Sequence, residues 1–411
     1  MVAAHSVACE VGIMKHWKIG IVLDSAKPSL GLHGLHVAFN GLPNVQVVGY
    51  VDSNEQDIEQ KLAVCHAQKH YTTLEQMLDS EELDIVVICS RNPADHWPMI
   101  KPIAQRGIHM YCDKPLTLSL KEADKIIALT QKHQVKMCIA QPIRNALVFR
   151  TMKTMIDAGE IGKPLTAYGR GKCDHRGGAE DLITLGIHLM DWQRFLFGDP
   201  QSVWANISQD GKPITASTRI ETVEPIGPLA GDSVMACFNF ANDVRGLFES
   251  RRGLFDMQSG YIHMGLTVVG TKGTLSLRFN DSLKPVYDLR ISRLPAPPED
   301  QAAYEPVKLH ETREIPGAEP LDESLCGTRN IPREPFILQA NRYSAWNLIQ
   351  CIENDQQPNC TPHHARNALE MIYGVFAASL SGKQVSFPLT GYETSDKSML
   401  DNGVIDLLLR P

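Results

Sequence analysis

The tripeptide Asp113-Lys114-Pro115 combines a carboxylate, an ammonium group and a restricted turn in one short segment. It follows the apolar run 108–112 and precedes a stretch of helical periodicity that opens near Ser119. This order predicts a buried parallel strand that feeds a crossover helix. Ligands of open α/β sheets bind beyond the carboxyl ends of such strands, so Lys114 is placed where chemistry usually occurs. Taken alone, Lys114 could equally be a surface lysine in a loop, and the rest of the chain must decide.

A partner for Lys114 is suggested by the segment 177–191, which has a helical pattern. If it is helical, Thr184 and His188 lie one turn apart on the same face, and Asp191 lies one turn further. Imidazole titrates near neutral pH and suits proton transfer. Oxidation of an alcohol to a ketone needs a base for the hydroxyl proton while hydride leaves to nicotinamide, and a lysine ammonium can polarise that oxygen. A single histidine on a helix is more often structural, so this pairing needs support from elsewhere.

The elements that position these residues begin with a regular alternation of strands and helices in the first third of the chain. After an N-terminal extension at 1–16, we expect a doubly wound parallel sheet, an α/β Rossmann domain, over residues 17–140. The expected strands cover residues 18–23, 45–51, 84–89, 108–112 and 135–140. The expected helices cover residues 31–40, about 55 onward, 73–80, 94–106 and 119–133.

After residue 140 the pattern changes to long, often alternating strands. This predicts an α+β domain over residues 141–390, with a predominantly antiparallel sheet and helices on one face, and then a tail at 391–411. Residues 281–335 are rich in Pro, Glu and Asp and are expected to be irregular. The expected strands cover residues 165–172, 202–208, 233–240, 244–251, 266–270 and 274–279. The expected helices cover residues 146–158, 179–197, 340–353 and 363–380.

The segment after the first strand departs from the usual dinucleotide-binding loop. A pyrophosphate site needs glycines at the N-terminus of the following helix, and only Gly31 and Gly34 remain, where they could instead serve helix packing. Asp52 ends the second strand, where an acidic side chain accepts hydrogen bonds from the adenosine ribose; its alternative role is to cap the next helix. A carboxylate there repels a 2′-phosphate, and no Arg or Lys follows before Lys61, so we expect NAD rather than NADP.

The composition argues against several classes of function. The net charge is −7, from 40 basic and 47 acidic residues of interspersed sign, which argues against a nucleic-acid partner. The 10 cysteines form no CxxC pair and lie mostly in apolar runs, so we expect reduced thiols in a cytoplasmic protein. We expect neither a signal peptide nor a membrane span. The acidic and histidine residues between 174 and 188 lack a familiar ligand spacing, so no metal site is expected.

Several motifs in a fixed order resemble the Gfo/Idh/MocA oxidoreductases, the family of glucose-fructose oxidoreductase and myo-inositol dehydrogenase. Residues 113–116 are similar to the family's E-K-P motif, and residues 159–162 match its G-x-I-G turn. Residues 185–191 resemble its D-x-G-x-H-x-x-D helix, and residues 270–275 its G-T-x-G turn. With the similar C-terminal helix around 364–366, the resemblance runs nearly end to end. It implies a Rossmann domain, a second domain with an open-faced sheet, NAD(P), and sugars, polyols or related alcohols as substrates.

By this resemblance Lys114 is the catalytic lysine and His188 is the proton-transfer histidine. Asp113 replaces the family's glutamate and keeps its charge. Thr184 occupies the position where many members carry an aspartate, and threonine cannot stabilise an imidazolium as a carboxylate can. Asp181, one turn earlier, could compensate, or another group could orient the histidine. The supporting residues are therefore Asp113, Asp181, Thr184 and Asp191.

Two further sets of residues complete the expected site. The first set is basic and lies on segments that border the substrate in the family, although each member could also be a solvated charge on a strand. This set comprises Arg144, Arg170, Lys172, His175 and Arg176. The second set is assigned to the cofactor. It comprises Gly31, Gly34, Asp52, Ser90, Asn92, Pro93, His96, Asp113 and Lys114.

The leading hypothesis is an NAD-dependent dehydrogenase that acts on a secondary hydroxyl of a sugar, glycoside or cyclitol. One alternative is an enzyme that oxidises a glycoside transiently with tightly held NAD, so that elimination and re-addition cleave it. A second alternative is a non-enzymatic sugar or dinucleotide sensor, against which the retention of Lys114 and His188 argues. The resemblance also implies a homodimer or homotetramer. The expected partner is a small-molecule sugar or polyol, with no nucleic acid and no membrane.

Overall fold

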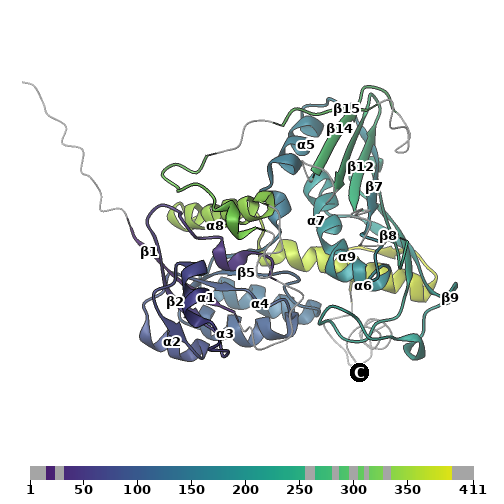
Figure 1. Ribbon diagram of the computed structural model, residues 1–411. Helices are drawn as coiled ribbons and strands as arrows, with labels where there is room; N and C mark the ends of the chain where they lie inside the picture. Colours follow the sequence, from purple (N-terminus) through teal and green to yellow (C-terminus); the bar gives the residue numbers. More distant parts are fainter. Residues whose placement is uncertain are drawn as a thin grey trace, which may run out of the picture.

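The computed structural model describes residues 15–23, 32–254, 264–279, 287–295, 304–309, 314–326 and 335–390. These residues form two β-sheets, each with helices packed against it (Figure 1). The first sheet comes from the N-terminal third of the chain, and the second sheet comes from the residues that follow.

The first sheet is parallel throughout, as the apolar runs predicted. Its strands lie in the order β3-β2-β1-β4-β5-β6, so the strand order reverses between β1 and β4. Ligands of doubly wound sheets bind at such a reversal, beyond the carboxyl ends of the strands. The Rossmann-type fold is therefore confirmed. The strands are β1 (Trp17–Val22), β2 (Val45–Val51), β3 (His70–Tyr71), β4 (Ile85–Ile88), β5 (His109–Cys112) and β6 (Met137–Ile139).

The helices of this part begin where the sequence places capping side chains. α2 (Leu74–Ser80) opens with a capping box, in which the Thr73 hydroxyl accepts from the backbone N–H of Gln76. α4 (Leu120–Lys132) opens with Ser119, whose hydroxyl accepts a backbone N–H of the first turn. Such caps satisfy N–H groups that have no partner inside the helix. The other helices of this part are α1 (Ile58–Cys65) and α3 (His96–Gln105).

The helix expected over residues 31–40 is wrong in the described part of that segment. Only a 3₁₀ turn, η1 (Leu35–Val37), forms there, and it is followed by further turns. Gly34 and Gly41 have positive φ angles of 85° and 65°. Glycine adopts this left-handed backbone readily, and it commonly ends a helix. The two glycines therefore confine the helical turn to the short segment between them.

The face of the first sheet above β1 is covered instead by α8 (Pro335–Glu353) (Figure 1). Leu348 and Ile349 of α8 belong to the same hydrophobic cluster as Ile19 and Ile21 of β1. Burial of apolar surface is the main stabilising term in folding. A helix from the C-terminal part of the chain therefore completes the core of the first sheet.

The second sheet is mixed and predominantly antiparallel, as predicted. Its order is β15-β14-β13-β12-β7-β11-β10-β8-β16, with β9 paired to β8. Among the described pairings of this sheet, only β7 with β11 is parallel. The strands are β7 (Pro164–Arg170), β8 (Ser202–Gln209), β9 (Lys212–Pro213), β10 (Ser233–Asn239), β11 (Arg245–Arg251), β12 (Gly265–Gly270), β13 (Thr274–Phe279), β14 (Tyr287–Ser292), β15 (Glu305–Pro306) and β16 (Val385–Ser386).

The prediction that residues 281–335 are irregular is wrong for β14 and β15, which extend one edge of this sheet. Leu289 and Ile291 of β14 are buried, and they alternate with the half-buried Asp288 and Arg290. This is the pattern of a half-buried strand. The prolines and acidic residues on either side of β14 are typical of loops and hide this pattern in the sequence.

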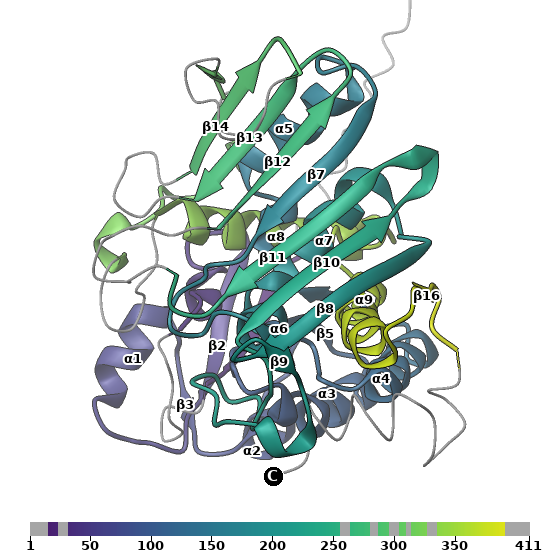
Figure 2. The same ribbon diagram turned by 90° about the vertical axis from the view of Figure 1, so that its right-hand side faces the viewer.

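Helices cover one face of the second sheet, as expected (Figure 2). In the described part of the chain the other face is open and exposes the large apolar side chains of Tyr168, Trp204 and Met235. No described helix is both long enough and apolar enough to cross a membrane. The covering helices are α5 (Leu147–Asp157), α6 (Ala179–Thr184), α7 (Gly186–Phe197) and α9 (Pro362–Ser381).

The single helix predicted over residues 179–197 is interrupted. α6 ends at Thr184 and α7 begins at Gly186, with the Leu185 backbone between them at φ −121° and ψ −38°. A Cβ atom on Gly186 would lie 3.0 Å from the Phe248 ring, so the chain passes very close to the sheet at this point. Thr184 and His188 therefore lie on two different helices, so the single helix on which their shared face depended is absent.

Candidate active site

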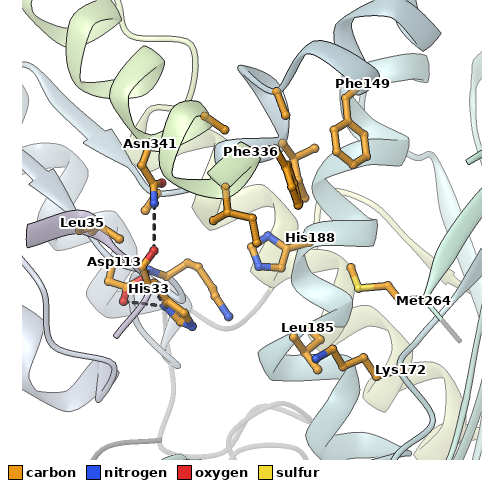
Figure 3. Close-up of a pocket in the computed structure, with 16 residues that line it drawn as sticks. His33, Leu35, Asp113, Phe149, Lys172, Leu185, His188, Met264, Phe336 and Asn341 are labelled. Atoms are coloured by element: carbon orange, nitrogen blue, oxygen red, sulfur yellow. Dashed lines mark hydrogen bonds and ion pairs between the residues drawn. The ribbon is translucent and has the colours of Figure 1, made fainter. Parts of the chain in front are cut away.

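A cleft lies between the loop after β5 and the start of α7 (Figure 3). Its empty space is about 750 Å³, part of it open to solvent. A mainly apolar wall with a few convergent polar groups is typical of small-molecule sites. The polar lining residues are His33, Asp113, Lys114, Lys172, His188 and Asn341. The apolar lining residues are Leu35, Ala140, Ile143, Ala146, Phe149, Leu185, Met264, Phe336, Ile337 and Ala340.

Lys114 connects the first sheet to the helices of the second. It follows β5, and its Nζ donates a hydrogen bond of 2.6 Å to the backbone carbonyl of Thr184, the last residue of α6. Carbonyl groups at a helix C-terminus attract a cation. The side chain is buried and lines the cleft. The ammonium group is thus held by a residue 70 positions further along the chain.

Thr184 takes part in this contact through its backbone. Its hydroxyl donates to the carbonyl of Glu180 at 2.9 Å, one turn back in α6. Its own carbonyl is available to Lys114 because α6 ends at this residue. The break between α6 and α7 therefore leaves the Thr184 carbonyl free to hold the Lys114 ammonium group.

Asp113, the residue before Lys114, is buried beside the cleft. Its carboxylate lies 2.8 Å from Nδ1 of His33, and its Oδ1 accepts the backbone N–H of Lys114 at 2.7 Å. Burial raises the pKa of Asp113 to about 6, against the lowering effect of the neighbouring ammonium. The carbonyl of His33 accepts from the amide of Asn341 in α8 at 2.9 Å. The segment before η1, the loop of Lys114 and α8 are thus directly connected.

His188 lies on α7, across the cleft from Asp113 (Figure 3). Its Nδ1 is hydrogen-bonded to the side-chain Oε1 of Gln141, which follows β6 and is almost fully buried. An amide oxygen can only accept, so Nδ1 carries the hydrogen and Nε2 is the basic nitrogen of the neutral ring. The sequence analysis missed Gln141. The one available indication was its place just beyond the carboxyl end of a strand.

Asp52 lies at the carboxyl end of β2, where a ribose-binding carboxylate is expected. It is fully buried, and its Oδ1 accepts the backbone N–H of Asn54 at 3.0 Å. Nζ of Lys61, on α1, donates to Oδ2 at 2.9 Å. The nearest following cation along the chain therefore pairs with Asp52, which the sequence analysis did not foresee.

The glycines assigned to the cofactor are described in part. Gly31 lies outside the described residues. Gly34 precedes η1, and a Cβ atom there would lie 3.2 Å from the side chain of Leu338 in α8. Gly34 therefore allows both a left-handed turn and the close approach of α8, which is the packing role that the sequence analysis left open.

The loops after β4 and β5 are held together by His96, which is fully buried. Its Nδ1 lies 2.9 Å from the carbonyl of Leu116, and its Nε2 lies 2.8 Å from the carbonyl of Ser90. Asn92 caps the 3₁₀ turn η2 (Pro93–Asp95) with its side chain. His96 therefore fixes the loops after β4 and β5 at the carboxyl edge of the first sheet, where ligands of such sheets bind.

Two family models match the chain in succession. The model described as "Oxidoreductase family, NAD-binding Rossmann fold" matches residues 31–141, and the model described as "GFO/IDH/MocA C-terminal domain" matches residues 149–276. Together the two models cover more than half of the chain. The boundary between them falls in the segment between β6, the last strand of the first sheet, and β7, the first strand of the second sheet.

The chain belongs to the GFO/IDH/MocA oxidoreductase family.

Individual relatives agree with this membership. The chain is 25% identical over 256 residues to 1,5-anhydro-D-fructose reductase of Ensifer adhaerens, which covers 59% of this chain and 71% of that protein. It is 24% identical over 229 residues to myo-inositol 2-dehydrogenase of Thermotoga maritima, which covers 54% of this chain and 63% of that protein. Curated relatives of the chain are matched over 40% to 71% of their own length.

Solved structures of the family share the fold. The crystal structure of the WlbA dehydrogenase from Bordetella pertussis, in complex with NADH and UDP-GlcNAcA, matches with a TM-score of 0.62 at 14% identity. The match covers 92% of this chain and 99% of that chain. At this identity the likeness concerns the fold alone.

The two aspartates near the family's histidine motif are placed away from the imidazole by their described contacts. Asp181 accepts from the Ser250 hydroxyl at 2.5 Å and from a backbone N–H. Asp191 pairs with the Arg144 guanidinium through two hydrogen bonds of 2.7 Å and 2.8 Å, and both side chains are buried. The proposal that Asp181 compensates for Thr184 therefore finds no support in its contacts.

The five basic residues assigned to the substrate are separated by the fold. Lys172 lines the cleft. Arg170 on β7 and His175 are exposed. Arg144 and Arg176 are buried in ion pairs.

A buried ion-pair network joins the two parts of the chain, and the sequence analysis did not predict it. Arg91, after β4, lies 2.6 Å from a carboxylate oxygen of Glu224, and Arg176 lies 2.9 Å from the other. Arg176 also pairs with Asp174 at 2.7 Å. Burial by itself would raise the pKa of Glu224, but Arg91, Lys114 and Arg176 together lower it. Glu224 therefore remains a carboxylate that holds the two parts together.

Among the residues that the structure describes, side chains that could bind a metal ion do not cluster. Across the described ranges, no group of three His, Cys, Asp or Glu side chains is placed to hold a metal ion.

Replacing Asp181 with asparagine is expected to stabilise the protein at pH 8 and to change it little at pH 4. Burial raises the pKa of Asp181 to about 6, above its ordinary value. Below the pKa that Asp181 has in the unfolded chain, the carboxyl group is protonated in both states and does not destabilise the fold. As the pH rises through about 6, the buried group ionises and the free energy of unfolding falls. Asparagine carries no charge and avoids this loss, which amounts to about 2–3 kcal/mol at pH 8. Urea unfolding of both proteins at the two pH values measures the difference, and an equal difference at both would contradict this origin.

Proposed function

We propose that the protein is an NAD-dependent dehydrogenase that transfers hydride between nicotinamide and a secondary hydroxyl of a sugar, glycoside or cyclitol. The observation that carries the proposal is that Lys114 and His188 line one cleft at the carboxyl edge of β5. An ammonium group and an imidazole on opposite sides of one cleft can hold a hydroxyl oxygen and remove its proton. The names of the sugar and inositol relatives support this class of substrate.

The roles of the two residues follow from their contacts. Lys114, anchored on the Thr184 carbonyl, would place its ammonium group against the substrate oxygen and stabilise negative charge as the proton leaves. His188, with Nδ1 bonded to Gln141, would accept that proton at Nε2. Bound NAD would supply the hydride acceptor. The apolar walls formed by Phe149, Phe336 and others would limit the access of water.

The residues present suit a dinucleotide. Asp52 offers a carboxylate at the end of β2, and the reversal of strand order lies beside it, between β1 and β4. The carboxylate favours NAD because it would repel a 2′-phosphate. Lys61 moderates this preference, since its ammonium group pairs with the same carboxylate.

Replacing Asp52 with alanine is expected to weaken NAD binding about 10-fold to 100-fold. This factor corresponds to the free energy of hydrogen bonds between the ribose hydroxyls and a charged carboxylate. NADP binding should improve relative to NAD, because Lys61 then meets the phosphate without a competing carboxylate. Calorimetric titration with both dinucleotides measures the two affinities. Asp57→Ala, which removes an exposed carboxylate at the start of α1, is the matched control and should leave both affinities unchanged. An unchanged ratio in Asp52→Ala would remove Asp52 from the cofactor site.

The function itself is tested with the purified protein, NAD and a broad panel of sugars, glycosides and cyclitols. Reduction of NAD by at least one alcohol of the panel is the expected result. Release of an aglycone without net NADH would instead indicate the glycoside-cleaving reaction. Dinucleotide or sugar binding with no reaction across the panel would indicate a sensor, and absence of any binding would refute the proposal.

We further propose a homo-oligomer in the cytoplasm. The apolar residues Tyr168, Trp204 and Met235 on the open face of the second sheet support association. The cysteines of the described residues are all free, which suits a reducing compartment. Sedimentation equilibrium measures the oligomeric state.

A further inference from the structure

We propose that Gln141 is the positioning residue for His188, and that it fixes both the tautomer of the imidazole and its strength as a base. The inference rests on the proposed role of His188 in proton transfer. It also bears on Thr184, because Gln141 gives the imidazole a hydrogen-bond partner in a chain that lacks the aspartate of the family's pattern.

The position of Gln141 is set by its backbone. Its N–H donates to the carbonyl of Ile139 at 2.7 Å, and its carbonyl accepts from the N–H of Arg144 at 3.2 Å. These bonds form a tight turn directly beyond β6. The side chain is 1% exposed and is therefore held in one place by its surroundings.

The contact decides the tautomer because the Oε1 atom of Gln141 can only accept. Nδ1 of His188 must donate, so Nε2 carries no hydrogen in the neutral ring and is the atom that can take a proton. The Nε2 atom of Gln141 is buried without a hydrogen-bond partner. The bond to His188 is therefore the one side-chain hydrogen bond that Gln141 makes among the described residues.

The neutral amide has a second consequence. A carboxylate at this distance would favour the imidazolium strongly, and an amide oxygen favours it less. His188 therefore gives up its proton more readily than a histidine paired with aspartate, and the base form is available at lower pH. The other titratable groups that face the cleft are His33, Asp113, Lys114 and Lys172, and Asp191 lies behind it in its pair with Arg144.

Two substitutions test the inference. Gln141→Glu restores a carboxylate and is expected to move the titration midpoint of His188 upward by about 1 to 3 pH units. The acid limb of the pH profile of alcohol oxidation should move upward by the same amount. Gln141→Leu removes the acceptor at similar volume and is expected to lower kcat about 10-fold to 100-fold with KM nearly unchanged, because the ring loses its fixed tautomer. Gln105→Glu, an exposed change on α3, is the control for added charge and should alter neither.

The His188 titration is followed by NMR in the full chain, with His188→Gln used to assign the resonance. An unmoved titration in Gln141→Glu, together with full kcat in Gln141→Leu, would overturn the inference. If the titration midpoint of His188 moves in Gln141→Glu but the pH profile of alcohol oxidation does not, the contact is supported and the role of His188 as the base is refuted. The inference about Gln141 and the proposed function can therefore fail independently. If the glutamate variant does not fold, Gln141→Asn is used, since its shorter amide breaks the contact without adding charge. Full kcat in that variant would also overturn the inference.

Discussion

Replacing Lys114 with alanine is expected to lower the rate of hydride transfer about 10²-fold to 10⁴-fold while the fold remains intact. The ammonium group of Lys114 lies in the cleft and is held there by its hydrogen bond to the Thr184 carbonyl, which links the first sheet to α6. Without it, the developing charge on the substrate oxygen has no partner on that side. The fold should tolerate the change, because the lost hydrogen bond to the Thr184 carbonyl costs only about 1 kcal/mol and Arg91 and Arg176 still pair with Glu224.

The measurement is the pre-steady-state rate of NADH formation, taken with circular dichroism and NAD affinity on the same samples. Lys121→Ala, which removes an exposed lysine from α4, should keep the full rate. A near-normal rate in Lys114→Ala would exclude the lysine from the mechanism. An unfolded variant would show instead that Lys114 is mainly structural.

Replacing Asp191 with leucine is expected to destabilise the protein by about 3–5 kcal/mol, because it leaves the Arg144 guanidinium buried without its partner. The double variant Arg144→Met/Asp191→Leu should recover much of this loss, since a buried ion pair replaced by apolar side chains is often near neutral. This result would show that Asp191 stabilises α7 through its ion pair with Arg144 and takes no part in proton transfer.

Urea unfolding of the two single variants and the double variant gives the coupling free energy of the pair. The surface pair of Asp157 with Lys153 in α5 is the control, and Asp157→Leu should cost no more than about 0.5 kcal/mol. A stable Asp191→Leu variant with a large loss of activity would return Asp191 to the catalytic residues.

The strands of both sheets were largely predictable because each is a local pattern. The apolar runs of β2 and β5 and the alternation in β10 and β11 reflect which faces are buried, and this is written in neighbouring residues. The prediction was wrong where a local pattern was weak or incomplete. η1 is confined by two glycines, and β14 is surrounded by residues typical of loops.

The sequence by itself determined the order of the elements and the presence of Lys114 and His188 on segments that meet at one sheet edge. It did so because strand and helix periods, and the ends of parallel strands, depend on residues close together in the chain. The tertiary structure alone decided which groups those residues contact. Lys114 is held by the Thr184 carbonyl, 70 positions away, and His188 is held by Gln141, 47 positions away. Both contacts depend on where α6 and α7, which pack on the second sheet, meet the loops that follow β5 and β6 of the first sheet. No spacing within one element encodes this meeting.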